Sequence, residues 1–147
     1  MNAEQSTILL VEDDQVEIEL ARRACALCEP ALQLVVVGDS TEALGWLSKT
    51  AAAKKQFPKL ILLDLKLPHL IGLAVLRRLR MNPATWDLPI IVYSKMHEPP
   101  DVVLSYQVGA NSFVNKPEDI DQFNALLHEL SDYWLLPRQR KLSLGST

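Results

Sequence analysis

The sequence lacks long hydrophobic runs, and none of its apolar stretches approaches the roughly 18 residues that a membrane-spanning helix needs. Its first residues, MNAEQST, contain neither the basic region nor the apolar region of a secretory signal. We therefore expect no membrane association and a cytoplasmic location.

Cysteine is also scarce, with Cys25 and Cys28 as the only two in 147 residues. Their C-x-x-C spacing occurs in thiol redox pairs, which use a helix N-terminus to lower a thiol pKa. Here both cysteines lie near the end of a predicted helix over about 15–27. We expect them to be reduced residues that pack in the core.

Neither sign of charge is in large excess, because 15 Lys and Arg face 18 Asp and Glu, for a net charge of -3. Such a chain has no electrostatic footprint for nucleic acid. Its five glycines form no Gly-rich phosphate loop, so a nucleotide is not expected to bind directly.

What the chain does contain is a series of short apolar segments, each followed by a helical pattern. Residues 60–63, Leu-Ile-Leu-Leu, are apolar on both faces and stop at Asp64, which predicts a buried strand of a parallel sheet. Similar segments lie at 7–11, 32–37, 89–94 and 112–115. Five alternations of strand and helix predict an α/β fold with a doubly wound, five-stranded parallel sheet and helices on both faces.

Spacing of apolar residues also predicts which helix faces are buried. In the first helix, Val16, Leu20, Ala24 and Leu27 form the expected buried stripe. The third helix is expected to present Arg77, Arg78 and Arg80 to solvent. Capping signals at Asp39 and Asp119 mark the starts of the second and last helices.

Polar side chains follow four of the five predicted strands. They are Glu12, Asp13 and Asp14 after the first, Asp64 after the third, Ser94 at the end of the fourth, and Lys116 after the fifth. The carboxyl ends of parallel strands share one edge of a sheet, so these groups are expected to lie together.

Such a cluster of carboxylates, a hydroxyl and a lysine is suited to metal binding and phosphoryl transfer. Neighbouring carboxylates raise one another's pKa unless a cation neutralises them, and Mg²⁺ suits one or two carboxylates with several waters. An ionised Asp64 can then attack phosphorus to form an aspartyl phosphate. Lys116 and the Ser94 hydroxyl are suited to bind the phosphoryl oxygens.

The chain resembles the receiver domains of two-component response regulators. The resemblance is carried by LLVEDD at 9–14, LLDLKLPHLIG at 62–72, PIIVYS at 89–94 and GANSFVNKP at 109–117, in that order. It covers roughly residues 7–134 and implies a (βα)5 flavodoxin-like receiver fold.

The resemblance implies that Asp64 is the phosphoacceptor and that Mg²⁺ is the cofactor. It assigns metal binding to Glu12, Asp13, Asp64 and the backbone carbonyl of Lys66. The chain would catalyse only its own phosphorylation and dephosphorylation.

It further assigns Ser94 as the switch hydroxyl, Phe113 as the switch aromatic, and Lys116 as the lysine that contacts the phosphoryl group. Phosphorylation would draw Ser94 inward and shift the fourth strand and helix between two packings. The phosphorylated state would then be recognised by an unknown downstream protein.

The ending GANSFVNKPEDIDQF, with YWL at 133–135, resembles more narrowly the stand-alone regulators of phytochrome-type sensor kinases. This resemblance implies a sensor histidine kinase, of the phytochrome type, as the phosphodonor.

We expect a receiver domain over residues 1–134 and a C-terminal tail over 135–147 that carries no DNA-binding module. The aromatic and leucine residues of this tail favour a dimerisation arm, exchanged reciprocally in a homodimer.

Two alternatives remain open from the sequence. A degenerate receiver would act as a scaffold without phosphorylation, and Lys95, where the family usually has a small residue, is its best support. An aspartyl-phosphate phosphatase would need a second acid two residues beyond Asp64, where this chain has Lys66.

Overall fold

The computed structural model describes residues 6–28, 31–53, 57–65, 69–95 and 98–135. Strands and helices alternate along the chain throughout this part. The strands are β1 (Thr7–Val11), β2 (Gln33–Val37), β3 (Leu60–Asp64), β4 (Ile90–Ser94) and β5 (Ser112–Asn115). The helices are α1 (Gln15–Leu27), α2 (Ser40–Ala52), α3 (His69–Arg80), α4 (Pro99–Val108) and α5 (Ile120–Trp134).

The strands form one sheet in the order β2-β1-β3-β4-β5, and every neighbouring pair is parallel. The strand order changes direction between β1 and β3, which creates a crevice at the carboxyl edge of the sheet. The predicted doubly wound, five-stranded parallel sheet is confirmed.

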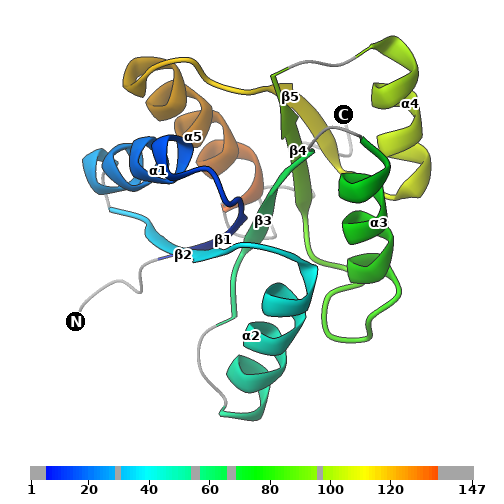
Figure 1. The fold of residues 1–147 in the computed structure, drawn as a ribbon. Helices are drawn as coiled ribbons and strands as arrows, with labels where there is room; N and C mark the ends of the chain where they lie inside the picture. The colour runs from blue at the N-terminus through cyan, green and yellow to red at the C-terminus, as the bar shows by residue number, and fades with distance from the viewer. Residues whose placement is uncertain (1–5, 29–30, 54–56, 66–68, 96–97, 136–147) are drawn as a thin grey trace, which may run out of the picture.

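Each face of the sheet has its own apolar layer. Alternate residues of β1 point to opposite faces, so Ile8 and Leu10 pack with α1 and α5, whereas Leu9 and Val11 pack with α2 and α3. Figure 1 shows α1 and α5 together on one side of the sheet, and α2, α3 and α4 on the other. Because β1, β3 and β4 are buried along their whole length, the side chains at their carboxyl ends are held by rigid elements.

Helix starts follow the predicted capping signals. Asp39 Oδ1 accepts a hydrogen bond from the Glu42 backbone N–H at 2.9 Å, and Asp119 Oδ1 accepts one from Gln122 at 2.8 Å. Asp14 caps α1 in the same way, with its side chain accepting from the N–H groups of residues 16 and 17. These bonds satisfy helix N–H groups that have no partner inside the helix.

The predicted buried stripe of α1 is only partly right, because Ala24 is buried and Leu20 packs against the core as expected, but the other two residues do not. Val16 is 77% exposed and Leu27 62% exposed, although both were expected in the buried stripe. The helix packs against α5 through small residues instead, since Ala21 and Ala24 allow the two helices to approach closely. Its buried residues are Glu17, Ile18, Ala21, Ala24 and Cys25.

Both cysteines are buried free thiols, as the sequence indicates. Burial raises the pKa of Cys25 to about 12, with a smaller contribution from Cys28. Thiols with raised pKa are poor nucleophiles, so the C-x-x-C spacing here serves packing.

One arginine of α3 does not belong to a solvated face. Arg80 turns back at the helix end, where its Nε donates to the Gly109 carbonyl at 2.9 Å and its Nη1 to the Trp86 and Leu88 carbonyls at 2.9 and 2.7 Å. Its Nη2 also donates to Asn111 Oδ1 at 2.6 Å. Arg80 therefore connects α3 to the loops before β4 and before β5, while the other two arginines of the helix are exposed as predicted.

None of the helices in the described part of the chain has the length and apolar character needed to cross a membrane.

Replacing Arg80 with methionine should lower the free energy of unfolding by about 2–3 kcal/mol, because several loop carbonyls lose their donor. Arg77→Met on the exposed face of the same helix is the matched control and should change stability by less than about 0.5 kcal/mol. Urea denaturation measures both. Equal effects of the two substitutions would show that Arg80 does not act through these bonds.

Candidate functional site

The carboxyl edge of the sheet brings the predicted polar residues together. Glu12 follows β1 directly, Asp64 and Ser94 are the last residues of β3 and β4, and Lys116 follows β5. All four are largely removed from solvent, with Glu12 1%, Ser94 2% and Asp64 8% exposed. Residues separated by about a hundred positions in the sequence thus share one small volume.

Lys116 lies at the centre of this volume. Its Nζ is 2.9 Å from Glu12 Oε1 and 3.0 Å from Asp64 Oδ1, and the side chain is only 8% exposed. The same ammonium lies 5.0 Å from the centre of the Tyr93 ring. One buried cation is therefore shared by two buried carboxylates, which leaves a net negative charge when both are ionised.

Glu12 is held at both carboxylate oxygens. Oε1 also accepts a hydrogen bond from the Tyr93 hydroxyl at 2.9 Å, and Oε2 accepts from the backbone N–H groups of Asp13 and Asp14, each at 3.2 Å. In this geometry Glu12 is the counterion of Lys116. Its predicted part in metal binding stays a prediction.

The electrostatics of the site follow from burial. Burial and the nearby charge of Glu12 raise the pKa of Asp64 to about 6, although Lys116 acts in the opposite direction. Burial alone lowers the pKa of Lys116, but the two carboxylates outweigh it and the net pKa is raised. Burial, followed by the charge of Glu12, raises the pKa of Tyr93, which keeps the phenol protonated as a donor. Asp64 thus lacks part of the positive charge that full ionisation requires.

A cavity of about 190 Å³ opens beside the Asp64 carboxyl. Asp13 and Asp64 both line it, together with Val11, Gly38, Asp39, Leu63, Gly72 and Val75. Gly72 allows α3 to pass close to the chain that follows Asp64, since a Cβ there would lie 3.0 Å from the Leu65 Cα. The cavity is therefore narrow and carries negative charge on one side.

These residues fit a magnesium ion. Among the described residues no three Asp, Glu, His or Cys side chains form a ready-made metal cluster. Mg²⁺ does not need one, because it binds through one or two carboxylates and retains several waters. Of the three aspartates that line the cavity, Asp13 and Asp64, the latter with a raised pKa, supply that donor set. The backbone carbonyl of Lys66 falls outside the described residues.

The two predicted switch residues lie on neighbouring strands. The Ser94 carbonyl accepts a hydrogen bond from the Lys116 backbone N–H at 2.9 Å, so the end of β4 is tied to the end of β5. Phe113 is partly buried and packs against the core layer under α2 and α3. Its backbone N–H donates to the Tyr106 hydroxyl at 3.1 Å, which links β5 to α4. Their switch roles stay predictions.

Sequence reasoning missed two features of the site. Tyr93 was read only as part of an apolar strand, yet a buried tyrosine hydroxyl requires a partner, and that requirement was the available signal. Glu17 is buried on α1, and its Oε1 lies 3.1 Å from the Lys95 Nζ. No spacing rule indicated this pair, because the buried face of α1 was predicted only in part.

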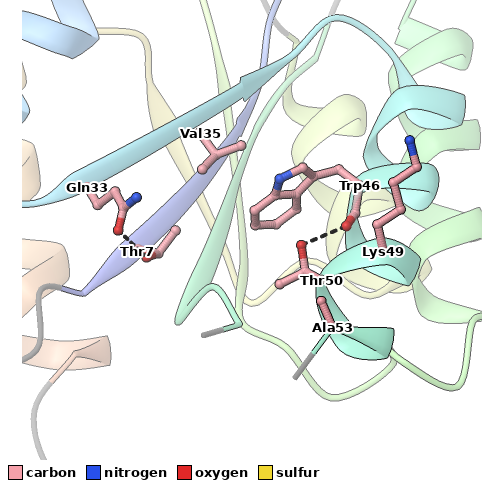
Figure 2. Close-up of a pocket in the computed structure, with 7 residues that line it drawn as sticks. All are labelled: Thr7, Gln33, Val35, Trp46, Lys49, Thr50 and Ala53. Atoms are coloured by element: carbon pink, nitrogen blue, oxygen red, sulfur yellow. Dashed lines mark hydrogen bonds between the residues drawn. The ribbon is translucent and has the colours of Figure 1, made fainter. Parts of the chain in front are cut away.

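A larger cavity, of about 530 Å³, lies at the opposite end of the sheet. Figure 2 shows Trp46 and Thr50 of α2 on the side toward Val35 of β2, Lys49 extending along α2 behind Trp46, and Thr7 at the start of β1. The described residues that line this cavity include no carboxylate, in contrast to those at the carboxyl edge.

Comparison with known proteins gives the same answer as the geometry. The family model for the response regulator receiver domain matches residues 8–128. Response regulator Rcp1 of Synechocystis sp. strain PCC 6803 is 28% identical over 129 residues, which are 87% of this chain and 88% of Rcp1.

Solved structures of similar sequence share the fold. The phosphorylated cyanobacterial phytochrome response regulator RcpA is 30% identical with a TM-score of 0.75, covering 90% of this chain and 95% of RcpA. The bacteriophytochrome response regulator AtBRR is 35% identical with a TM-score of 0.68, covering 92% of this chain and 99% of AtBRR. The Mn²⁺-bound form of Rcp1 is 27% identical with a TM-score of 0.71, covering 88% of this chain and 94% of that structure.

The strand order, the acidic and basic groups at the carboxyl edge and the match over residues 8–128 agree with one another, so the chain belongs to the response regulator receiver domain family.

Proposed function

We propose that Asp64 accepts a phosphoryl group from a phosphohistidine of a sensor histidine kinase and that the phosphorylated chain signals by a change in conformation. Receiver domains are signalling phosphoacceptors, which sets the class of reaction. The observation that carries the residue assignment is the 3.0 Å contact between Lys116 Nζ and Asp64 Oδ1 at the edge of a cavity shared with Asp13.

The residues divide the transfer between them. A carboxylate oxygen of Asp64 attacks phosphorus, the bond between phosphorus and the histidine nitrogen breaks, and its electron pair returns to the imidazole. Lys116 neutralises charge on the new phosphoryl oxygens, and the Ser94 hydroxyl donates a hydrogen bond to one of them. The chain then catalyses only its own phosphorylation and dephosphorylation.

Magnesium is the proposed cofactor, held by Asp13, Asp64 and the Lys66 carbonyl, with Glu12 close by. Receiver domains bind divalent metal ions, and the relative Rcp1 has a Mn²⁺-bound form. When bound, the ion supplies positive charge that favours the ionised Asp64 and the phosphoryl oxygens. The raised pKa of Asp64 supports this assignment, because a nearby divalent cation would lower it.

Ser94 and Phe113 are the proposed switch. A phosphoryl group on Asp64 is a new acceptor near the end of β4, and movement of Ser94 toward it would alter the packing behind that strand. The Tyr106 hydroxyl, which accepts from the Phe113 backbone N–H, would carry the change to α4. An unknown downstream protein would then distinguish the two states at the face made by α4, β5 and α5.

A phytochrome-type kinase is the proposed phosphodonor. Support comes from RcpA and AtBRR, which are phytochrome and bacteriophytochrome response regulators, respectively. A receiver must meet the kinase where its phosphohistidine forms, so the proposal includes a cytoplasmic location.

The scaffold alternative relies on Lys95 as an obstruction of the acceptor. The Lys95 ammonium instead pairs with Glu17 at 3.1 Å, while Lys116 occupies the contact with Asp64. The geometry therefore favours a phosphoacceptor over a scaffold.

Residues 1–134 constitute the proposed receiver domain, and residues 135–147 the proposed dimerisation arm. Residues 136–147 lie outside the described part of the chain. A cavity of about 470 Å³ between β5 and α5, lined by Val114, Leu126, Leu130, Tyr133 and Trp134 among others, supports the proposal. In a two-fold dimer each arm would cover this cavity on the other subunit.

Incubation with acetyl phosphate and Mg²⁺ should add the mass of one phosphoryl group to the protein. Intact mass spectrometry measures the gain, which should be absent in Asp64→Asn and in a sample without divalent metal. Asp13→Asn should gain mass at least tenfold more slowly, because it removes a metal ligand. An unmodified parent under saturating donor would favour the scaffold.

The ionisation of Asp64 gives a pH prediction for the metal-free protein. Its folded-state pKa of about 6 exceeds the ordinary value of 3.8, so folding opposes ionisation. The parent should therefore lose about 2–3 kcal/mol of stability relative to Asp64→Asn as the pH rises from about 4 to about 7. Urea denaturation in EDTA measures this difference.

Asp132→Asn, which removes the same charge from the exposed side of α5, is the control for that experiment. Its stability should follow that of the parent across the pH range. If the free energy of unfolding of Asp64→Asn also changes with pH as that of the parent does, the Asp64 carboxyl does not have the raised pKa.

Removal of residues 136–147 should convert a dimer to a monomer in light scattering coupled to size exclusion. Val16→Ser, which changes an exposed apolar residue on α1, should remain dimeric. A monomeric parent, before and after phosphorylation, would rule out the arm.

A further inference from the structure

Glu17 is a buried charged residue that the phosphorylation chemistry does not use. It lies in the first turn of α1, and its side chain is 6% exposed. Oε1 pairs with Lys95, whereas Oε2 is buried without a hydrogen-bond partner among the described residues. A half-satisfied buried carboxylate costs free energy, so stability alone does not account for this residue.

Its partner occupies a sensitive position. Lys95 directly follows Ser94, the last residue of β4, and its side chain is 62% exposed. Lysine has a long flexible stem, so its ammonium reaches many positions unless a partner fixes it. Here Glu17 fixes it, and the ion pair extends from the end of β4 to α1.

The pair borders a cavity of about 720 Å³ that, among the described residues lining it, adjoins Asp64 only through Lys116. Lys116, whose Nζ contacts Asp64, forms part of the same wall. The lining residues are Glu17, Lys95, Asn115, Lys116, Pro117 and Glu118. The exposed Lys95 side chain and the almost buried Lys116 side chain therefore mark the outer and inner parts of one cavity.

An exposed lysine contributes little to stability through such a pair, typically less than about 1 kcal/mol. A neutral residue at position 17 would avoid the cost of the buried charge. Since stability does not explain the ion pair, its remaining effect is to position the Lys95 side chain over the cavity and away from Asp64.

We propose that Glu17 is a positioning residue that holds Lys95 across this cavity and so limits access of water to the phosphoryl group on Asp64. The inference rests on the proposed function. In the reaction that it slows, a water oxygen attacks phosphorus and the bond between phosphorus and the Asp64 oxygen breaks. The electron pair stays on the Asp64 carboxylate, and inorganic phosphate leaves with the oxygen and protons of water.

The first experiment measures the lifetime of the phosphorylated state. Each variant is phosphorylated with acetyl phosphate and Mg²⁺, the donor is removed, and intact mass is followed with time. Glu17→Gln and Lys95→Ala should each shorten the half-life about three- to fivefold, as loss of an ion pair of this exposure implies. The double variant should be no faster than either single variant, because both remove the same contact.

Matched controls separate the pair from general effects. Glu19 lies on the same helix, is exposed and pairs with Arg23, so Glu19→Gln removes an equal charge and should leave the half-life unchanged. Lys95→Arg keeps a cation that reaches Glu17 and should keep the long half-life. Unchanged lifetimes in Glu17→Gln and Lys95→Ala, or independent effects that multiply in the double variant, would overturn the proposal.

A second readout does not require phosphorylation. Acetylation of Lys116 by an amine-reactive ester, measured by peptide mass against the exposed Lys59, should be several-fold faster in Glu17→Gln and Lys95→Ala than in the parent and Glu19→Gln. If Lys116 is labelled faster in the two variants but the protein gains no phosphoryl mass, the inference that Lys95 covers the cavity stands and the proposed function is rejected. Unchanged labelling of Lys116 in variants that gain phosphoryl mass normally would reject the covered cavity and retain the proposed function.

Discussion

The ammonium of Lys116 between Glu12 and Asp64 is the contact on which the rest of the site depends. Two carboxylates this close and this buried would otherwise repel each other and take up protons. With one cation between them, Glu12 is fully satisfied by Lys116, Tyr93 and two backbone N–H groups. Asp64 shares the same cation, and burial together with the charge of Glu12 raises its pKa to about 6. One cation between two carboxylates leaves a net negative charge, which is the condition that a divalent cation relieves.

The parallel sheet stabilises the buried cluster of Lys116, Glu12 and Asp64. β1, β3 and β4 are covered on both faces, and their apolar residues fix the strand ends before any polar contact forms. Asp64 pairs with a residue of β4 and Ser94 with one of β5 in the strand register, and the Glu12 backbone N–H donates to the carbonyl of the last residue of β2, so these three residues have little freedom to separate. Burial of apolar side chains in the core therefore offsets the free-energy cost of burying these charged groups, which their mutual contacts alone do not offset.

Strand positions, helix starts and the shared edge followed from the sequence because each depends on a local signal. Wholly apolar runs mark buried parallel strands, and Asp39 and Asp119 mark helix starts by bonds to residues three positions away. The buried face of α1 followed only in part, although Ala24 is buried as expected. The residues buried in place of Val16 and Leu27 are Glu17, Ile18, Ala21 and Cys25. Arg80 was likewise misplaced, because its acceptors are carbonyls, which carry no sequence signature.

The bonds of Arg80 also bear on how α4 is able to move. They fix Gly109, where φ is 131° and α4 ends, to the end of α3. A Cβ at Gly109 would lie 2.8 Å from the Arg80 Cγ, so the Arg80 side chain packs directly against this glycine. The ten residues of α4 span about 15 Å, and a rotation of only about 10° about that fixed end displaces the other end by about 2.6 Å. Since the Gly109 end of α4 is bonded to α3, a rotation of the helix would displace most the end that begins at Pro99.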